Sequence, residues 1–261
     1  MQFARKVVAI TGAAGGIGRE LCRHFGEQGA AVAALDRRDA VAAFADELRG
    51  SGIRVEPAVV DVGDAAGVAT AFARLIGLLG PIDVLINNAG VTTNAVLERT
   101  SPDGFNDDLH ANLTGAFNCV HAVLPAMKAR RSGTIVNVGS VNGLMALGDP
   151  AYSAAKAGLI SLTRAIALEC GRYNIRANIV CPGTVRTPIW DERASRNPEI
   201  LAQLRRWYPL GRIVEPTEVI QAVAFLASDA ASAITGAVLP VDCGLTAGNL
   251  VMARELTLED L

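Results

Sequence analysis

Short apolar runs that alternate with longer amphipathic stretches constrain the fold of this chain more than any other feature of its sequence. Several runs contain only Val, Ile, Leu and Ala, as expected of parallel strands covered on both faces. Parallel neighbours require crossover connections, so the pattern predicts an α/β fold with a doubly wound, seven-stranded parallel sheet and helices on both faces. We expect strands at 7–10, 31–35, 55–60, 84–86, 134–138, 176–180 and 237–241, and helices near 16–28, 39–49, 64–79, 101–129, 150–170 and 216–227.

The length and composition of the chain favour one domain. A chain of 261 residues could form one large α/β domain or two small ones. Apolar residues make up 51% of the sequence, enough for a sizeable core, and no Pro/Ser-rich linker or block of charge divides it. We therefore expect a single Rossmann-type domain over residues 1–261.

Residues 184–213 interrupt the alternation of strands and helices. The segment contains Pro188, Pro198 and Pro209, together with Trp190, Trp207 and Tyr208. It is too long for an ordinary connection, and long insertions in compact α/β domains are often lids or binding loops. We expect a substrate-binding insertion or lid here; the alternative is a packed surface excursion. The tail after Gly244 is expected to be peripheral or to pack on a neighbouring subunit.

Charge and composition argue against several classes of function. A net charge of −2 and an aromatic content of 5% give no reason to expect nucleic acid as a partner. No apolar run reaches the ~18–20 residues of a membrane helix, and the first residues pass directly into a strand without room for a secretory signal. The five cysteines form no CxxC pair, so we expect buried, reduced thiols, no metal site and a cytoplasmic protein.

A glycine-rich turn follows the first predicted strand and opens the first predicted helix. It reads Thr11-Gly12-Ala13-Ala14-Gly15-Gly16-Ile17-Gly18. Gly12 permits a tight turn, Gly16 lets the backbone approach a phosphate, and Gly18 lets the helix press on the sheet. A pyrophosphate would meet unpaired N–H groups and the positive end of the helix dipole. Because a second strand ending in an acid follows, the turn predicts a dinucleotide site.

That acid is Asp36, eighteen residues after Gly18. A carboxylate there can accept both ribose hydroxyls of NAD, and it repels the 2′-phosphate of NADP. Arg37 and Arg38 follow at once, and arginine can pair with that phosphate. Asp36 lies nearer the strand end, so we favour NAD over NADP and interpret the two arginines as a solvated pair at a helix start.

Two further strand ends fit the same pocket. Asp61 and Val62 could hold the adenine edge, and Asn87-Asn88-Ala89-Gly90 is a small polar cluster where backbone must pass the nucleotide closely. Ligands of open α/β sheets bind beyond the carboxyl ends of the strands. The candidate coenzyme contacts are Gly12, Gly16, Ile17, Gly18, Asp36, Arg37, Asp61, Val62, Asn88, Ala89 and Gly90.

Ser140, Tyr152 and Lys156 form a second constellation, after the fifth predicted strand and on the next helix. Asp149 is a good N-cap for that helix and Pro150 suits its first position. Tyr152 and Lys156, four residues apart, share one helix face. A neighbouring ammonium and a cationic nicotinamide ring would lower the tyrosine pKa from ~10. Tyr152 could then take a proton from an alcohol as hydride leaves the carbinol carbon, with Ser140 hydrogen-bonded to the reacting oxygen.

Each of these residues also has an ordinary explanation. A tyrosine and a lysine at helical spacing are common, and so is a serine after a strand. Their joint occurrence beyond a nucleotide fold favours a functional trio. Asn112 lies inside a predicted helix, where asparagine is unfavourable without a role, and a kink or a bound water there would suit a proton relay.

The chain resembles the short-chain dehydrogenase/reductase family, of the ordinary one-domain type, over essentially its full length. The matching elements are Thr11-Gly12 to Gly18, Asn87-Asn88-Ala89-Gly90, Asn112, Ser140, Tyr152-x3-Lys156 and Pro182-Gly183. The resemblance implies that Tyr152 is the general acid/base and that Lys156 binds the nicotinamide ribose and tunes Tyr152. It also implies that Ser140 orients the substrate and that Asn112 holds a water linking Lys156 to solvent.

The same resemblance implies further contacts and an assembly. Pro182, Gly183 and the segment that follows, with Val185 and Thr187, would meet the nicotinamide amide. Family members are usually tetramers, so we expect a homotetramer built partly from the helices near 101–129 and 150–170.

The sequence constrains the identity of the substrate less than that of the coenzyme. The candidate contacts are Ser140, Asn142, Met145, Leu147, Tyr152, Thr184, Trp190 and Tyr208. Asn142 could reach a second hydroxyl of a diol or sugar, or it could be a turn residue that bonds its own backbone. Arg193, Arg196, Arg205 and Arg206 could bind an anionic substrate, but a solvated basic helix face is the preferred interpretation.

We therefore expect an NAD(H)-dependent oxidoreductase for a secondary alcohol or ketone of polyol, sugar or hydroxy-acid type. Many similar enzymes reduce 3-oxoacyl thioesters of acyl carrier protein, generally with NADP and with a charge soon after Asn-Ala-Gly. The loop Val91-Thr92-Thr93-Asn94 and Asp36 depart from that pattern, so such a reductase is the alternative. A non-catalytic NAD-sensing regulator and a structural subunit are further alternatives, and the intact trio argues against both.

Overall fold

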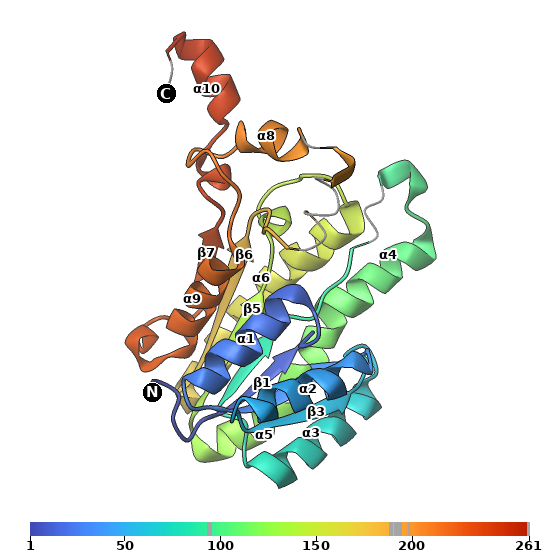
Figure 1. The fold of residues 1–261 in the computed structure, drawn as a ribbon, viewed down its shortest axis with the longest axis vertical. Coiled ribbons are helices and arrows are strands. Elements are labelled where there is room, and N and C mark those ends of the chain that lie inside the picture. Colours follow the sequence, from blue (N-terminus) through green and yellow to red (C-terminus); the bar gives the residue numbers. More distant parts are fainter. Residues whose placement is uncertain (93–95, 188–189, 191–194, 198, 260–261) are drawn as a thin grey trace.

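The computed structural model describes residues 1–92, 96–187, 190, 195–197 and 199–259. Over these residues the chain forms a seven-stranded parallel sheet in the order β3-β2-β1-β4-β5-β6-β7 (Figure 1). The strands are β1 (Val7–Thr11), β2 (Ala31–Asp36), β3 (Val55–Val59), β4 (Val84–Asn87), β5 (Gly133–Val138), β6 (Ile175–Pro182) and β7 (Val238–Val241). The predicted doubly wound α/β fold is confirmed.

Helices connect the strands as the apolar periodicity predicts. They are α1 (Gly16–Glu27), α2 (Ala40–Gly50), α3 (Ala65–Leu79), α4 (Pro102–Leu109), α5 (Gly115–Arg130), α6 (Pro150–Cys170), α8 (Ile200–Arg205), α9 (Pro216–Ala227) and α10 (Leu250–Thr257). Short helical turns are η1 (Leu97–Arg99), η2 (His110–Thr114), η3 (Val141–Gly143), η4 (Gly171–Tyr173), η5 (Asp229–Ala231) and η6 (Leu245–Ala247). No helix among the described residues is long and apolar enough to cross a membrane.

Alternate residues of each strand serve two separate cores, one on each face of the sheet. Val8 and Ile10 of β1 pack in a cluster with buried residues of α1, α2 and α9. Val7 and Ala9 of the same strand belong to a second cluster, with buried residues of α3, α5 and α6. Because both faces are covered, the strands carry apolar residues at consecutive positions, which explains their unbroken apolar runs.

The helix predicted over 101–129 is interrupted. Residues 110–114 form a π-helical turn, η2, between α4 and α5. At its centre the side-chain amide of Asn112 donates to the carbonyl oxygens of Asp108, at 2.9 Å, and Val91, at 2.7 Å. The bond to Asp108 engages a carbonyl four residues back, where the helix ladder itself would bond, and such competition widens a helix locally. Of the two alternatives predicted at Asn112, a kink or a bound water, the structure shows a local change of helix geometry, the π-helical turn.

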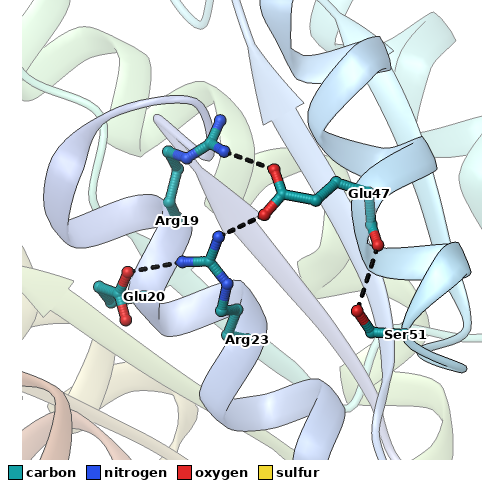
Figure 2. A network of polar contacts seen from close by, with 5 residues as sticks. All are labelled: Arg19, Glu20, Arg23, Glu47 and Ser51. Carbon is teal, nitrogen blue, oxygen red and sulfur yellow. Dashed lines mark hydrogen bonds and ion pairs between the residues drawn. The ribbon is translucent and has the colours of Figure 1, made fainter.

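Helices α1 and α2 are held side by side by charged groups (Figure 2). Glu47 of α2 accepts from Arg19 at 2.7 Å and from Arg23 at 2.5 Å. The Arg19 guanidinium also lies 4.0 Å from the ring centroid of Phe44. Glu20 pairs with Arg23 at 2.7 Å on the same helix. These contacts clamp the outer surface of the two helices that follow β1 and β2, next to the glycine-rich turn.

The described part of the 184–213 insertion is partly packed into the body. Val185 forms a parallel bridge with Val214, and Tyr208 and Ile213 are buried. Helix α8 lies near α10 at the end of the molecule away from the N-terminus (Figure 1). Pro188, Arg193 and Pro198 lie outside the described residues, as do Thr93 and Asn94 of the loop after β4.

Candidate active site

The glycine-rich turn after β1 and the loop after β4 are joined by hydrogen bonds. The N–H groups of Asn88 and Ala89 both donate to Thr11 Oγ1 at 3.0 Å. Asn88 Nδ2 donates to the carbonyl oxygens of Thr11, at 3.0 Å, and Gly12, at 3.3 Å. Gly12 has φ +67°, and a Cβ on it would lie 2.9 Å from Ala89 Cα. The two loops therefore meet so closely that only glycine fits at position 12.

The first turn of α1 has the properties of a phosphate site. Its N-cap residue, Gly15, offers no side chain to the first N–H groups, and the first helical residue, Gly16, is exposed. Gly18 presses on the turn, since a Cβ there would lie 2.0 Å from the Gly12 carbonyl oxygen. Ile17 is half-buried against the core. Uncapped N–H groups at a helix start bind phosphate oxygens, so the residues present fit a dinucleotide.

Asp36 is buried at the end of β2, at the same edge of the sheet. Its carboxylate accepts from the Ala14 N–H at 2.8 Å and from the Arg38 N–H and Nε at 3.0 and 3.1 Å. Burial acts to raise the pKa of Asp36, but the bonds from Arg38 and Ala14 outweigh it and hold the pKa below its ordinary value. Arg38 is exposed just before α2, as the interpretation of a solvated pair predicts, but it also forms an ion pair with Asp36, which that interpretation did not include. Arg37 is exposed.

Asp61 and Val62 lie directly beyond β3. Asp61 is exposed and its Oδ1 accepts from the Gly63 N–H at 2.8 Å. Asn118 of α5 donates to the carbonyl oxygens of Val62 and Gly63 at 2.9 and 3.1 Å. Asn118 was not among the predicted residues, yet it fixes the backbone at this strand end.

Lys156 is buried below Tyr152 on α6. Its Nζ donates to the Val138 carbonyl oxygen at 3.0 Å and lies 5.4 Å from the Tyr152 ring centroid. A Cβ added to Gly90 would lie 3.3 Å from Lys156 Nζ and 2.7 Å from Asn112 Oδ1. Burial lowers the pKa of Lys156 from 10.5 to about 8. The structure therefore gathers Tyr152, Lys156 and Asn112 around Gly90.

In the chain without coenzyme the pKa of Tyr152 is raised above its ordinary value. Burial is the largest cause, the Ser140 hydroxyl acts to lower the pKa, and the negative charges of Asp149 and Asp108 add to the increase. Lys156 is close, but its Nζ is bonded to a carbonyl oxygen. The predicted decrease includes the positive charge of a bound nicotinamide ring, so it stays a prediction.

Ser140 and Asn142 form a small network at the end of β5. The Asn142 N–H donates to Ser140 Oγ at 3.2 Å, and Ser140 Oγ donates to Asn142 Oδ1 at 3.3 Å. Asn142 Nδ2 donates to Ser153 Oγ at 3.2 Å and to the Gly148 carbonyl oxygen at 3.4 Å. Asn142 thus acts as a turn residue, and it also borders the cavity described next.

A cavity of about 630 Å³ opens above Tyr152 and Ser140. It brings together the substrate contacts predicted at Ser140, Asn142, Met145, Leu147, Tyr152, Thr184, Trp190 and Tyr208. Tyr208 lines it while its hydroxyl accepts from the Thr184 N–H at 3.0 Å. Further lining residues, which the sequence did not single out for this role, are Thr92, Val141, Asp149, Leu204, Trp207, Leu245, Gly248, Asn249 and Leu250.

Known proteins of similar sequence and structure were compared with the chain. The sequence profile of the enoyl-(acyl carrier protein) reductase family matches residues 12–246. An uncharacterized oxidoreductase of Schizosaccharomyces pombe is 43% identical over 261 residues, 100% of this chain and 98% of the relative. An oxidoreductase of the short-chain dehydrogenase/reductase family from Burkholderia thailandensis is 54% identical, with a TM-score of 0.91 and 98% of each chain covered. This chain is a short-chain dehydrogenase/reductase.

A third similar protein bears on the coenzyme. A gluconate 5-dehydrogenase from Burkholderia cenocepacia, solved in complex with NADP and tartrate, is 34% identical. Its TM-score is 0.89, and the match covers 95% of this chain and 98% of that chain.

The segment after β6, for which the resemblance implies contacts with the nicotinamide amide, borders the cavity in part. Gly183 and Val185 line the cavity, and the Gly183 N–H donates to the Val241 carbonyl oxygen at 3.0 Å. Pro182 is buried at the end of β6, and the Thr187 carbonyl oxygen accepts from the Trp190 N–H at 2.8 Å. The structure therefore places Gly183 and Val185 beside Tyr152, while Pro182 and Thr187 lie outside the cavity lining.

The structure corrects one sequence-based expectation about the cavity rim. Asp149 stands at the N-cap position of α6 with φ +47°, but its side chain accepts no N–H of the helix. The first helical bond is made by the backbone, where the Ser153 N–H donates to the Asp149 carbonyl oxygen at 2.8 Å. The expectation that the tail after Gly244 is peripheral or packs on a neighbouring subunit stays a prediction. In this short-chain dehydrogenase/reductase, Leu245 and residues 248–250 of that tail form part of the cavity wall.

The cysteines of this short-chain dehydrogenase/reductase lie in the protein interior. All five are free and buried. Within the described ranges, no group of three or more His, Cys, Asp or Glu side chains could hold a metal ion.

Proposed function

We propose that this enzyme transfers a hydride between the nicotinamide of NAD(H) and a secondary alcohol or ketone, with Tyr152 as the general acid/base. One observation carries the proposal: Tyr152 and Ser140 line the same cavity, and Lys156 is buried directly below Tyr152 on α6. The uncapped start of α1 and the Gly90 backbone lie at the same sheet edge. A coenzyme that spans the sheet from Asp36 to Gly90 would present its ring to this cavity.

The residues of the chain handle the proton. When bound, the oxidised coenzyme supplies the hydride acceptor and a positive ring charge. Tyr152 Oη accepts the hydroxyl proton of the alcohol as the carbinol hydrogen leaves, and returns it in the reverse direction. The Ser140 hydroxyl orients the reacting oxygen. Lys156, protonated at neutral pH with its pKa of about 8, provides positive charge next to the phenolate that forms.

Asn112 would support the proton transfer through its position beside Gly90 and Lys156. Both hydrogens of its amide are donated to protein carbonyls, and Oδ1 accepts from the Val91 N–H at 3.3 Å. A second lone pair of Oδ1 is left for a water between Asn112 and Lys156, beside Gly90. That water would connect the ammonium to solvent.

We propose NAD as the preferred coenzyme. The Asp36 carboxylate lies where a ribose would bind, is ionised at neutral pH, and repels a 2′-phosphate. Two observations oppose this: the paired Arg38 guanidinium is half-exposed beside Asp36, and the similar gluconate 5-dehydrogenase was solved with NADP.

The proposed substrate classes are polyols, sugars and hydroxy acids, with a 3-oxoacyl thioester of acyl carrier protein as the alternative. The similar enzyme named for gluconate supports the first group, and the name of the matching family supports the second. We also propose that the described residues of 184–213 form a lid or substrate-binding insertion, since Trp190, Leu204, Trp207 and Tyr208 line the cavity.

A homotetramer in the cytoplasm is the proposed state. Phe117 on α5, Leu168 on α6 and Phe225 on α9 are large apolar side chains that are exposed in the single chain, and assembly would cover them. Five buried free thiols fit a reducing compartment. Light scattering on the purified protein measures the assembly directly.

The central experiment compares Tyr152→Phe with Tyr173→Phe. Both changes remove one phenol hydroxyl, but Tyr173 lies in η4, outside the cavity lining. Secondary alcohols are offered with NAD and NADP, and the absorbance of the reduced nicotinamide is followed. Loss of the general acid/base should lower kcat by about 10²–10⁴-fold in Tyr152→Phe, while NADH affinity stays within about twofold. Full activity of Tyr152→Phe would overturn the proposal, and binding without turnover in the wild type would favour an NAD-sensing regulator.

A further inference from the structure

The cavity above Tyr152 has an apolar body. Leu147, Trp190, Trp207 and Leu250 contribute large apolar side chains from three separate segments, and Ser140 and Tyr152 form the polar floor. Such a wall suits a compact hydrocarbon skeleton better than a fully hydroxylated chain, because each unpaired hydroxyl would lose its water.

One ionisable group breaks this apolar wall. Asp149 lines the cavity from the residue that precedes α6. Its backbone adopts a left-handed conformation, φ +47°, which is uncommon for a residue other than glycine. It does not form the helix cap that its position would allow, and its side chain makes no hydrogen bond or ion pair with another described residue. The carboxylate is therefore available to a molecule in the cavity.

The charge of Asp149 reaches the floor of the cavity. It is close enough to Tyr152 to contribute to the raised pKa of the phenol. Among the described lining residues there is no Lys, Arg or His that would neutralise it. A carboxylate or phosphate on the substrate would be repelled, whereas a hydroxyl or an ammonium group could donate to Asp149.

We propose that Asp149 determines substrate specificity and that the enzyme prefers a secondary alcohol on an apolar ring whose second group donates a hydrogen bond, above all a protonated amine. This inference rests on the proposed hydride transfer and narrows its substrate class away from hydroxy acids and from fully hydroxylated polyols and sugars. In the oxidation, the carbinol C–H bond breaks and its hydrogen passes with two electrons to NAD⁺. The O–H proton passes to Tyr152, and a ketone forms. The ring fills the apolar wall, and the second group reaches Asp149.

The test uses one ring with three second groups: cyclohexanol, 4-aminocyclohexanol and 4-hydroxycyclohexanecarboxylate, near neutral pH with saturating NAD. We expect kcat/KM for the amine to exceed kcat/KM for cyclohexanol by about tenfold or more, because the ammonium forms a charged hydrogen bond with Asp149. We expect kcat/KM for the carboxylate to fall about tenfold or more below the value for cyclohexanol, because like charges repel. Equal kcat/KM for the amine and the carboxylate would overturn the inference.

The variant Asp149→Asn separates charge from backbone effects. Asparagine tolerates the left-handed conformation and has nearly the same shape. We expect the ratio of kcat/KM between amine and carboxylate to fall by about tenfold or more. Asp103→Asn, an exposed aspartate in the first turn of α4, is the matched control and should leave all ratios unchanged. An unchanged ratio in Asp149→Asn would also overturn the inference.

A separate measurement distinguishes failure of the proposed function. If none of the three alcohols is oxidised, calorimetry with the enzyme–NADH complex compares 4-aminocyclohexanone with 4-oxocyclohexanecarboxylate. Tighter binding of the amine, lost in Asp149→Asn, would support the role of Asp149 even though the proposed turnover had failed. Equal binding would overturn that role independently of turnover.

Discussion

The coenzyme region and the substrate cavity share one edge of the sheet but are built in different ways. Around β1 and β4, the contacts are made by backbone atoms and small side chains: Thr11 with Asn88 and Ala89, and Asp36 with Ala14. The cavity is instead lined by bulky side chains from segments between Thr92 and Leu250, far apart in the sequence. The shape of the coenzyme region is set by backbone segments that approach one another closely. The shape of the cavity is set by the side chains that face into it.

This difference teaches that the two regions should respond separately to mutation. A change that disturbs a backbone contact near Gly12 should alter coenzyme affinity for every substrate. A change of a cavity side chain should alter the Michaelis constant for one substrate and leave coenzyme affinity alone. Tyr152 and Ser140 lie where the regions meet and are the exception.

The largest effect is expected for Gly18→Ala. The added Cβ would lie 2.0 Å from the Gly12 carbonyl oxygen, so the turn must move, and overpacking of this kind costs about 1–3 kcal/mol of stability. We expect the Kd for NADH to rise at least about 100-fold. In Gly77→Ala the Cβ meets nothing within 4 Å, so this control should keep coenzyme affinity and gain about 0.5–1 kcal/mol of stability. Fluorescence titration and urea unfolding measure both; normal NADH affinity in Gly18→Ala would contradict the backbone argument.

Asp36→Ala should change coenzyme preference by about tenfold or more, expressed as the ratio of the Kd values for NADPH and NADH. The substitution removes the charge that repels a 2′-phosphate and releases Arg38 from its ion pair. Asp103→Ala, which removes an exposed carboxylate from the first turn of α4, serves as the control. A ratio unchanged in Asp36→Ala would mean that coenzyme choice is decided elsewhere.

Leu250→Ala should raise the Michaelis constant by about three- to tenfold for a ring substrate, because it removes apolar area from the cavity wall. NADH affinity should not change, which sharpens the separation of the regions. Leu256→Ala lies on the same helix at an exposed position and is the control. A parallel loss of NADH affinity in Leu250→Ala would break the comparison.

Asp149→Asn should also move the pH profile. Burial raises the pKa of Tyr152, and the negative charge of Asp149 adds to this increase. Oxidation of an alcohol needs the phenolate, so removing the charge lowers the pKa and the rate should reach its plateau at a lower pH. The profile of kcat/KM for cyclohexanol is the measurement. A profile displaced to higher pH would contradict the sign.

The smallest effect is expected for Glu47→Gln, which weakens the pairs with Arg19 and Arg23 between α1 and α2 (Figure 2). These groups are solvent-accessible, so the urea midpoint should fall only slightly, and the difference from the wild type should shrink at about 1 M salt. Coenzyme affinity should be retained. A large loss of affinity would show that this clamp holds the glycine-rich turn in place.

The sequence predicted the fold and the coenzyme region well because both depend on local patterns. Apolar runs covered on both faces can hardly be anything but parallel strands, and α6 and α9 begin and end at the predicted residues. Gly12 and Gly18 are required by contacts within a few residues or with one neighbouring loop. Local contacts of this kind restrict which residue type can stand at a position, so they can be predicted from the sequence.

The cavity could be predicted only in part. Ser140 and Asn142 were selected from their places near a strand end, and Trp190 from the 184–213 insertion. Leu245 and Leu250 reach the wall only because the chain returns after β7. Asp149 looked like a helix cap, and only its backbone conformation reveals otherwise. The pairing of Arg38 and the effect of burial on Tyr152 depend on side-chain positions and depth, which residue spacing does not encode.

The wall formed by residues 248–250 has a practical consequence for handling the protein. An affinity tag fused after residue 261 would be attached through α10, directly to a segment that shapes the substrate pocket. The N-terminus lies far from α10, in the lower half of the view (Figure 1). Purification handles belong there, and kinetic constants obtained with a C-terminal fusion should be compared with those of the cleaved enzyme.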